Sequence, residues 1–391
     1  MAQHSLLSPS GAHRWMRCPG SIGAESGLPD TSSKYAAEGT AAHELAAKCL
    51  ELEANAEAVI GDTMTVDGYD FTVTADMAHH VNDYCKLVRE YAEGGQLLVE
   101  RRVNFSEAIG VPDSTGTSDA IVIHPDRLTV IDLKYGMGVK VDATENEQLQ
   151  LYALGALHDY SMMGDFNEIV MVVHQPRLNH VSEWSIPIAK LQEFGENARL
   201  AAIEALDHSS PRLNPGEKQC RFCKAKATCP ALKAEISDAI GGIATPADFA
   251  DLAVAEEDDV SRAMARVELV EQWCKAIRAE VERRLFAGQP VSGFKLVEGR
   301  RGNRAWSNEA AVEKLFKSFR FKKEEMYDLK LISPTKAEKL LKTKNPGRWE
   351  KVDALTSRGD GKPSVAPATD RRPALAVSSS DEDVLARLTA D

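Results

Sequence analysis

Two aspartates and a lysine sit at the ends of two apolar stretches in the segment 116–136, GTSDAIVIHPDRLTVIDLKYG. The dipeptide Pro125-Asp126 between the stretches favours a turn, so the pattern predicts an antiparallel hairpin. A symmetric hairpin centred on this turn places Asp119 directly opposite Asp132. Lys134 lies two residues beyond Asp132 and therefore projects from the same face of its strand.

Directly opposed carboxylates destabilise a strand pair by up to ~1 kcal/mol, and burial increases that penalty. A divalent cation between Asp119 and Asp132 removes the conflict, and hard oxygen ligands suit Mg²⁺ or Mn²⁺. The Leu133 carbonyl is a further oxygen ligand in this hypothesis. Lys134 would orient or activate a water, or neutralise charge on a phosphate. The alternative is a solvated strand end with a surface ion pair.

The segment after the hairpin, DATENEQLQLYALGAL, predicts a helix. Thr144 with Glu147 three residues later is typical of a capping box, so we expect the helix to begin there. Gln148 and Tyr152 are four residues apart and share one helical face. By themselves they also fit the polar edge of an ordinary amphipathic helix.

Two further polar residues precede the hairpin. In EGTAAHELAAKCL, Thr40 predicts a helix cap that places His43 in the first turn. A single histidine on an alanine-rich helix is most often a packing or surface residue. Glu100 is expected on the strand leading into the hairpin, where it neighbours Arg101 and Arg102 and fits an edge ion pair.

The chain has seven cysteines, and an odd count argues against a disulfide framework. Cys49, Cys85 and Cys274 lie in helical, apolar stretches and are predicted to be buried small hydrophobes. The other four are different, because Cys220, Cys223 and Cys229 form a C-x2-C-x5-C pattern to which Cys18 can add a fourth thiolate. Zinc and a [4Fe–4S] cluster both suit four thiolates.

G-x-x-D at 116–119, D-L-K at 132–134 and the following Q-x-x-x-Y resemble motifs of the PD-(D/E)XK nuclease superfamily, in particular its RecB/AddB-like branch. This resemblance implies that Asp119 and Asp132 bind the catalytic metal and that Lys134 serves the attacking water. It further implies that Gln148 and Tyr152 position the DNA backbone.

The same branch carries a G-x-x-x-H helix upstream of its strands, and Gly39 with His43 fits that spacing. The resemblance therefore implies that His43 completes the metal shell, with Glu100 as a weaker candidate for the same site.

The arrangement of one cysteine before the nuclease-like core and three after it is similar to that of AddB-type helicase–nucleases and CRISPR-adaptation nucleases. The resemblance implies a structural [4Fe–4S] cluster, with structural Zn²⁺ as the alternative. The whole chain also resembles a phage and prophage family known only as a domain of unknown function, which implies a setting in replication, recombination or repair.

The order of expected elements predicts an α/β fold with a mixed sheet flanked by helices. The resemblance makes this a restriction-endonuclease-like core over residues 1–235, closed by the four-cysteine cluster. A helical accessory region with a small β element is expected over 245–350, and a mostly disordered tail over 357–391.

The composition is that of an ordinary globular protein: 391 residues, 43% hydrophobic and 27% charged. The N-terminus lacks a secretion-signal pattern and no apolar run reaches membrane-spanning length, so we expect a cytoplasmic protein that does not bind membranes. The net charge of −12 argues against coating nucleic acid by bulk charge, but not against a local basic groove. No phosphate-binding loop of the ATPase type occurs, so any helicase partner would be a separate protein.

The sequence therefore predicts a divalent-metal-dependent deoxyribonuclease, with an exonuclease favoured, acting on single strands or duplex ends. A single-strand-binding or annealing protein is a further expected partner. Basic stretches at 221–226, 300–304 and 317–323 could hold DNA or be solvated faces. Two rival hypotheses are a non-catalytic DNA-binding accessory that retains the nuclease fold and a zinc-containing RNA nuclease.

Overall fold

The computed structural model describes most of the first 295 residues and parts of the remainder. The described ranges are 5–28, 34–207, 209, 212–241, 261, 264–295, 309–319, 322, 326, 337–338, 341–342 and 346–356. The chain divides into two compact units, Met1–Val297 and Glu298–Asp391. The predicted tail over 357–391 lies outside the described residues, as do most of 242–263 and the stretch 296–308.

A five-stranded mixed sheet forms the centre of the first unit, in the order β3-β4-β5-β6-β7. The strands are β3 (Gln96–Asn104), β4 (Thr115–Ile123), β5 (Arg127–Leu133), β6 (Glu168–Gln175) and β7 (His180–Pro187). All neighbours are antiparallel except β5 and β6, which run parallel. A parallel pair needs a long crossover, and helix α6 (Glu147–Tyr160) lies in it. The predicted mixed α/β sheet is confirmed.

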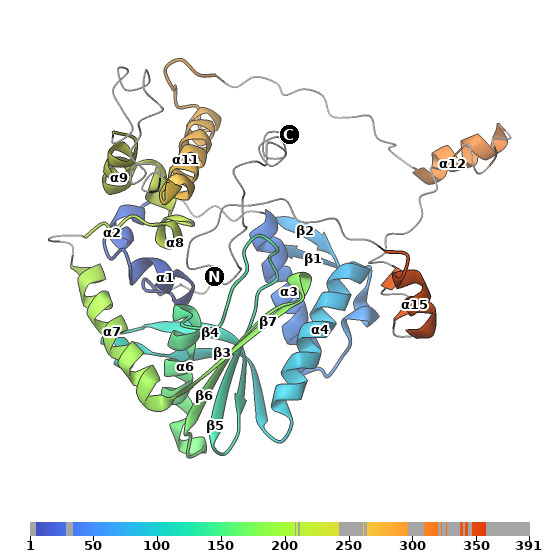
Figure 1. Cartoon of the computed structure of the whole chain (residues 1–391), viewed down its shortest axis with the longest axis horizontal. Coiled ribbons are helices and arrows are strands. Elements are labelled where there is room, and N and C mark those ends of the chain that lie inside the picture. The colour runs from blue at the N-terminus through green and yellow to red at the C-terminus, as the bar shows by residue number, and fades with distance from the viewer. Residues whose placement is uncertain are drawn as a thin grey trace, which may run out of the picture. The chain divides into compact units, whose positions relative to one another are not determined.

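Helices cover both faces of this sheet (Figure 1). Helices α3 (Lys34–Glu51) and α4 (Ala75–Ala92) lie on one face, whereas α6 and α7 (Ile188–Leu206) lie on the other. Strand β5 shows why the sheet needs both layers. Leu128 and Val130 pack in the α6–α7 core, while Ile131 and Leu133 pack in the α3–α4 core. The strand is mostly apolar because both of its faces are buried, and Thr129 and Asp132 are its buried polar residues.

The N-terminal segment consists of short, separate elements. The segment forms a 3₁₀ turn, η1 (Pro9–Gly11), then α1 (Ala12–Trp15), and after Pro19 a separate helix α2 (Ser21–Glu25). Proline lacks the N–H that a continuous helix needs, which explains the interruption at Pro19. Leu7 and Trp15 are buried in the α6–α7 core, so this segment is held by packing.

A small hairpin, which was not predicted, joins α3 to α4. Its strands are β1 (Thr63–Val66) and β2 (Tyr69–Thr72). Both turn residues, Asp67 and Gly68, have positive φ angles, of 50° and 80°. Asp-Gly between short strands is a strong signal for such a turn, so this element was visible in the sequence.

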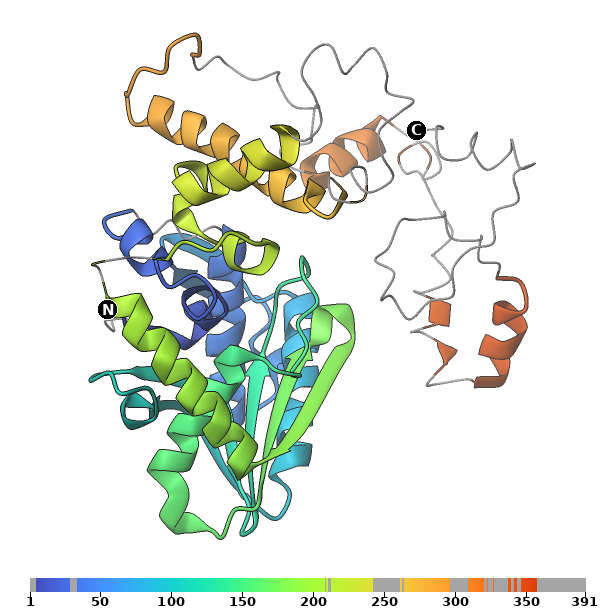
Figure 2. The same cartoon turned by 60° about the vertical axis from the view of Figure 1, so that its left-hand side comes forward.

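The remaining elements of the first unit are mostly short turns and the helices that follow α7. They are η2 (Ala56–Val59), α5 (Ser106–Ile109), η3 (Ser161–Met163), η4 (Pro176–Leu178), α8 (Glu217–Cys220), η5 (Lys224–Ala227), α9 (Pro230–Gly241) and α11 (Val267–Phe286). Leu269 of α11 packs with Cys220, Leu232 and Ile236, so this helix of the predicted accessory region lies against the cysteine-rich segment (Figure 2).

Helices α12 (Glu309–Ser318) and α15 (Pro346–Asp353) belong to the second unit. Near the expected small β element, the described part shows one isolated bridge, between Val291 and Phe294. Within the described residues, no helix is long and apolar enough to cross a membrane.

Candidate functional site

The β4–β5 hairpin has the predicted register. Its ladder runs from the pair Ile123–Leu128 to the pair Ala120–Ile131, with the turn at Pro125-Asp126. Asp119 and Asp132 face each other one position beyond the last ladder pair. At this position a side chain replaces the backbone acceptor of the ladder, because the N–H of Leu133 donates to Asp119 Oδ2 at 2.7 Å. This contact of Leu133 is made through its N–H, not through the carbonyl considered as a metal ligand.

A third carboxylate, that of Glu100, lies next to these two on strand β3. We call Glu100, Asp119 and Asp132 the acid row. The pairs Val99–Ala120 and Arg101–Ser118 flank Glu100, which places it opposite Asp119. Glu100 has a φ of 47°, in the left-handed region that side chains other than glycine rarely occupy. Such a backbone costs on the order of 1 kcal/mol or more, and strain of this kind is concentrated at functional sites.

The structure also brings His43 to this row from helix α3. His43 Nδ1 lies 3.0 Å from Asp119 Oδ1, and His43, Glu100 and Asp119 each offer one ligand atom within 4.8 Å of the others. The predicted Thr40 cap is wrong. The helix begins at Lys34, so Thr40 lies inside it and its hydroxyl donates to the Ala36 carbonyl.

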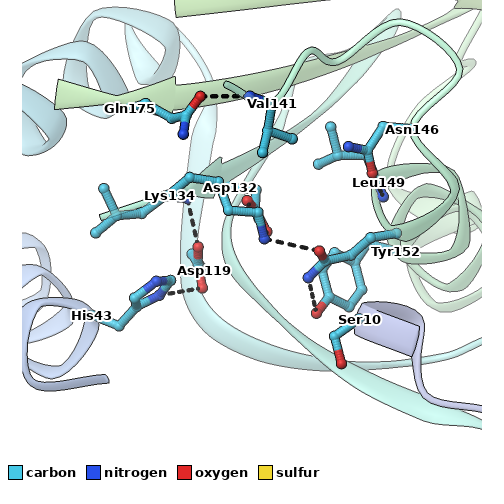
Figure 3. Close-up of polar contacts among 12 residues, drawn as sticks. Ser10, His43, Asp119, Asp132, Lys134, Val141, Asn146, Leu149, Tyr152 and Gln175 are labelled. Carbon is cyan, nitrogen blue, oxygen red and sulfur yellow. Dashed lines mark hydrogen bonds and ion pairs between the residues drawn. The ribbon is translucent and has the colours of Figure 1, made fainter. Parts of the chain in front are cut away.

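Lys134 connects the acids to helix α6. Its Nζ donates to Gln148 Oε1 at 2.9 Å and to Asp132 Oδ1 at 3.2 Å. Gln148 Nε2 in turn donates to the Tyr152 hydroxyl at 3.0 Å, so the predicted shared face is present. Figure 3 shows His43 and Tyr152 approaching from opposite sides, with Asp119 between them.

Helix α6 begins later than predicted. Asn146 caps it by accepting a hydrogen bond from the Leu149 N–H at 3.2 Å, and Glu147 is its first residue. The Thr144 capping box is therefore wrong. Asn146 is an equally good cap by type, and the tertiary anchoring of the preceding loop decides between the two.

Gly116 has a steric reason to precede the acids. A Cβ at this position would lie 2.6 Å from Pro9 Cγ and 2.8 Å from Tyr152 Cε1. Any side chain here would displace either the N-terminal segment or the tyrosine. The glycine of the G-x-x-D pattern therefore lets both elements approach the site closely.

Charges within the row shift the pKa values in opposite directions. Burial alone would lower the pKa of His43, but Asp119, by charge and hydrogen bond, raises it to about 9. Burial would raise the pKa of Asp119, yet His43 and the Leu133 N–H hold it below its usual value. Burial and the charge of Asp119 raise the pKa of Asp132 despite Lys134. Burial and Asp119 also raise the pKa of Glu100, to about 7.

These residues fit a hard divalent cation. Asp132 Oδ2 is buried and accepts no hydrogen bond from the described residues. Lys134 Nζ lies 3.0 Å from that oxygen, but its hydrogen bond goes to Oδ1. Glu100, Asp119 and His43 form a donor set with the carboxylate oxygens that Mg²⁺ and Mn²⁺ prefer, whereas Asp132 lies outside the group whose ligand atoms are within 4.8 Å of one another.

The cysteines occupy a second region, where the chain segments around Cys18 and residues 212–216 meet. Gly20 N–H donates to the Arg212 carbonyl at 2.9 Å, and Asn214 Nδ2 donates to the Arg17 carbonyl at 3.0 Å. Three of the four sulfurs accept backbone N–H groups: Cys18 from Asn214, Cys220 from Gly216 and Cys229 from Leu232. Burial raises the pKa values of Cys18 and Cys220, and the charge of Cys229 raises them further.

A closed four-cysteine cluster is not formed, however. All seven cysteines lie in described positions and are free thiols. Among these positions, no three sulfurs approach within 4.8 Å of one another. Cys49 and Cys85 are buried as predicted, whereas Cys274 is only half-buried.

The predicted basic stretches differ in what can be said of them. Within 221–226, Lys226 Nζ donates to the Arg221 carbonyl, and Phe222 is 63% exposed beside the His13 ring. Lys317 of α12 pairs with Glu313 on the same helix. The stretch 300–304 lies outside the described residues, as does most of 319–323.

The model of a protein family described as "Protein of unknown function (DUF2800)" matches residues 4–373, and the chain belongs to this family. Among solved structures, one titled "Crystal structure of SSO0001" is similar to part of the chain. The two are 18% identical, the match covers 56% of this chain and 84% of the other, and the TM-score is 0.24.

Proposed function

We propose that this protein is a divalent-metal-dependent DNA nuclease of the PD-(D/E)XK type, in the RecB/AddB-like branch, that hydrolyses phosphodiester bonds. One observation carries the proposal. Glu100, Asp119 and Asp132 occupy facing positions on three adjacent strands, and Lys134 contacts the last of them. His43 and Lys134 offset part of the repulsion among these acids, and a divalent cation bound beside them would offset more of it.

Asp119, Asp132, His43 and Glu100 would hold Mg²⁺ or Mn²⁺ in this proposal. When bound, the ion supplies Lewis-acid stabilisation of the scissile phosphate and a water of lowered pKa. Lys134 holds its positive charge between Asp132 and Gln148, where it orients that water and stabilises negative charge growing on the phosphate.

Gln148 and Tyr152 act on the other side of the lysine. Gln148 accepts from Lys134 and donates to Tyr152, so it fixes the direction of the ammonium group. The Tyr152 side chain is buried against Gly116 and Pro9, and its hydroxyl is the end of this hydrogen-bonded series. The pair thus holds the lysine in place and offers polar groups toward a DNA backbone.

The substrate we propose is DNA with a free end, cleaved as an exonuclease during phage or prophage recombination, replication or repair. The four thiols of Cys18, Cys220, Cys223 and Cys229 would bind a structural [4Fe–4S] cluster, with Zn²⁺ as the alternative. Backbone N–H bonds to three of the sulfurs support this proposal, because such bonds stabilise thiolates around a cluster.

A single assay tests the proposed activity. The purified protein is incubated with end-labelled single-stranded DNA, linear duplex, closed circular duplex and RNA of matched sequence. Each substrate is tested with Mg²⁺, with Mn²⁺ and with EDTA. We expect loss of linear DNA with either metal, no loss in EDTA and sparing of the closed circle. DNA binding without cleavage would instead show a non-catalytic accessory, and preferential cleavage of RNA would show an RNA nuclease.

A further inference from the structure

A second group of possible metal ligands lies on helix α4. His79, His80 and Asp83 each offer one ligand atom within 4.8 Å of the others. His79 Nε2 lies 3.4 Å from Asp83 Oδ2, and the rings of the two histidines are 5.4 Å apart. Asp83 follows His79 by four residues and His80 by three, and residues at these separations are neighbours on a helical surface.

The group faces a different side of the sheet from Lys134. His174, at the end of β6, is paired in register with Leu133, whose side chain belongs to the α3–α4 core. The His174 ring stacks on Tyr84 of α4 at 6.1 Å. His174 also lies within electrostatic range of His80 and Asp83. Lys134 and Gln148 instead contact each other beside α6.

Two buried ring nitrogens in this region have no hydrogen bond. They are His80 Nδ1 and His174 Nδ1, and neither has a partner among the described residues. His174 is only 6% exposed. Buried polar atoms are nearly always satisfied, so the unbonded nitrogen of His80, which belongs to the group, calls for an explanation. A surface pair between His79 and Asp83 does not account for it.

We propose that His79, His80 and Asp83 bind a Zn²⁺-class transition-metal ion at a site separate from the acid row. Two imidazoles and one carboxylate are a donor set typical of Zn²⁺, and of Co²⁺ as its substitute, whereas Mg²⁺ prefers oxygen ligands. The site does not depend on nuclease activity. All three ligands lie within one turn of α4, so a bound ion would stabilise this turn of the helix.

The test uses variants that should fold normally. His79 and Asp83 have side chains 56% and 47% exposed, so His79→Ala and Asp83→Asn remove ligands without opening the core. His158→Ala is the matched control, since His158 Nδ1 lies 3.3 Å from Glu107 on another surface, outside the group. Each full-length protein is dialysed against Zn²⁺ and its metal content measured. Thermal unfolding is then followed with and without Zn²⁺.

We expect the wild-type protein and His158→Ala to bind one Zn²⁺ per chain at this site. His79→Ala and Asp83→Asn should lack this ion or bind it at least ~10-fold more weakly. Zn²⁺ should raise the melting temperature of the first two proteins more than that of the ligand variants. Co²⁺ distinguishes this site from the cysteines, because imidazole and carboxylate ligands give visible bands without thiolate charge transfer. Equal metal content, equal affinity and the same Co²⁺ spectrum in all four proteins would overturn the proposal.

Discussion

The backbone N–H of Leu133 donates to Oδ2 of Asp119 at 2.7 Å, so a side chain takes the place of a backbone acceptor where the β4–β5 ladder ends. This bond, with that from His43, favours the ionised form of Asp119. Asp132 lacks such donors from the backbone and has a raised pKa. The two facing acids are therefore not equivalent. Asp119 is the fixed anion of the row, and the proton affinity of Asp132 responds to whatever cation lies beside it.

Replacing Glu100 by glutamine should stabilise the metal-free protein above neutral pH. The ordinary pKa of this carboxyl is 4.5, and burial and Asp119 raise it to about 7 in the fold. Between these values the folded protein keeps a proton that the unfolded chain has lost, so stability falls as pH rises through that window. The variant removes this fall, by no more than about 1 kcal/mol because solvent screens a partly exposed group.

Urea unfolding in EDTA at about pH 5 and about pH 8 measures this effect. Glu57→Gln, an exposed carboxylate change on η2, is the control and should behave as the wild type. If the free energy of unfolding falls equally for Glu100→Gln and the wild type between the two pH values, Glu100 does not carry the raised pKa. In Mg²⁺, by contrast, the variant should gain less stability than the wild type, since a ligand is missing.

Gln175 is predicted to hold the loop between Lys134 and Gln148 in place. Its side chain is 1% exposed and its Oε1 accepts from the Val141 N–H at 2.7 Å (Figure 3). Its Nε2 donates to the Val139 carbonyl at 2.9 Å. Gln175→Leu leaves both backbone groups without these bonds and should cost about 2–3 kcal/mol. Because the loop sets the distance between β5 and α6, cleavage should slow through kcat with KM little changed.

A matched control separates stability from positioning. Asn82 Oδ1 accepts from the Ala56 N–H at 2.9 Å, so Asn82→Ala also removes a bond between a side chain and the backbone, but away from the loop. It should lower the melting temperature without changing kcat at temperatures where the protein is folded. Equal kcat values for Gln175→Leu and Asn82→Ala would refute the positioning role.

The sequence was sufficient for the features that depend on local pattern. The mostly apolar strand β5, the turn at Pro125-Asp126 and the resulting position of Asp119 opposite Asp132 all followed from it, since strand period and turn chemistry are local. Glu100 could only be a weak candidate, because its place in the row depends on a third strand and on an unusual φ. The start of α6 was missed for a similar reason. Thr144 and Asn146 are both good caps, and the contacts of Gln175 with the loop are tertiary.

The α4 histidines show the limit of such prediction in another way. His79, His80 and Asp83 are close in sequence, whereas the buried ring of His174, which stacks on Tyr84 of the same helix, comes from a strand about ninety positions later. No periodicity in the chain relates these segments. The same holds for Cys18, whose approach to Asn214 depends on the packing of the N-terminal helices rather than on any local pattern.

The thiol proposal predicts a coloured protein. Purified anaerobically, the wild type should be brown, with broad visible absorbance from a [4Fe–4S] cluster. Cys220→Ser should lose the colour and melt at a lower temperature, because metal bonds contribute directly to folding. Cys274→Ser is the control and should keep both, since this half-buried thiol lies outside the proposed set. Colourless wild-type protein with stoichiometric zinc would replace the iron assignment by the zinc alternative.

The most direct test of the central claim is the rate of Mg²⁺-dependent DNA cleavage by Asp132→Asn. This change keeps the size of the side chain but removes a charge from the row. Asp165→Asn, in the loop before β6, serves as the control for a carboxylate outside the site. We predict that cleavage by Asp132→Asn falls at least ~100-fold, because several kcal/mol of transition-state stabilisation depend on the bound ion. Asp165→Asn should cleave at the wild-type rate. Undiminished Mg²⁺-dependent cleavage by folded Asp132→Asn would contradict the account.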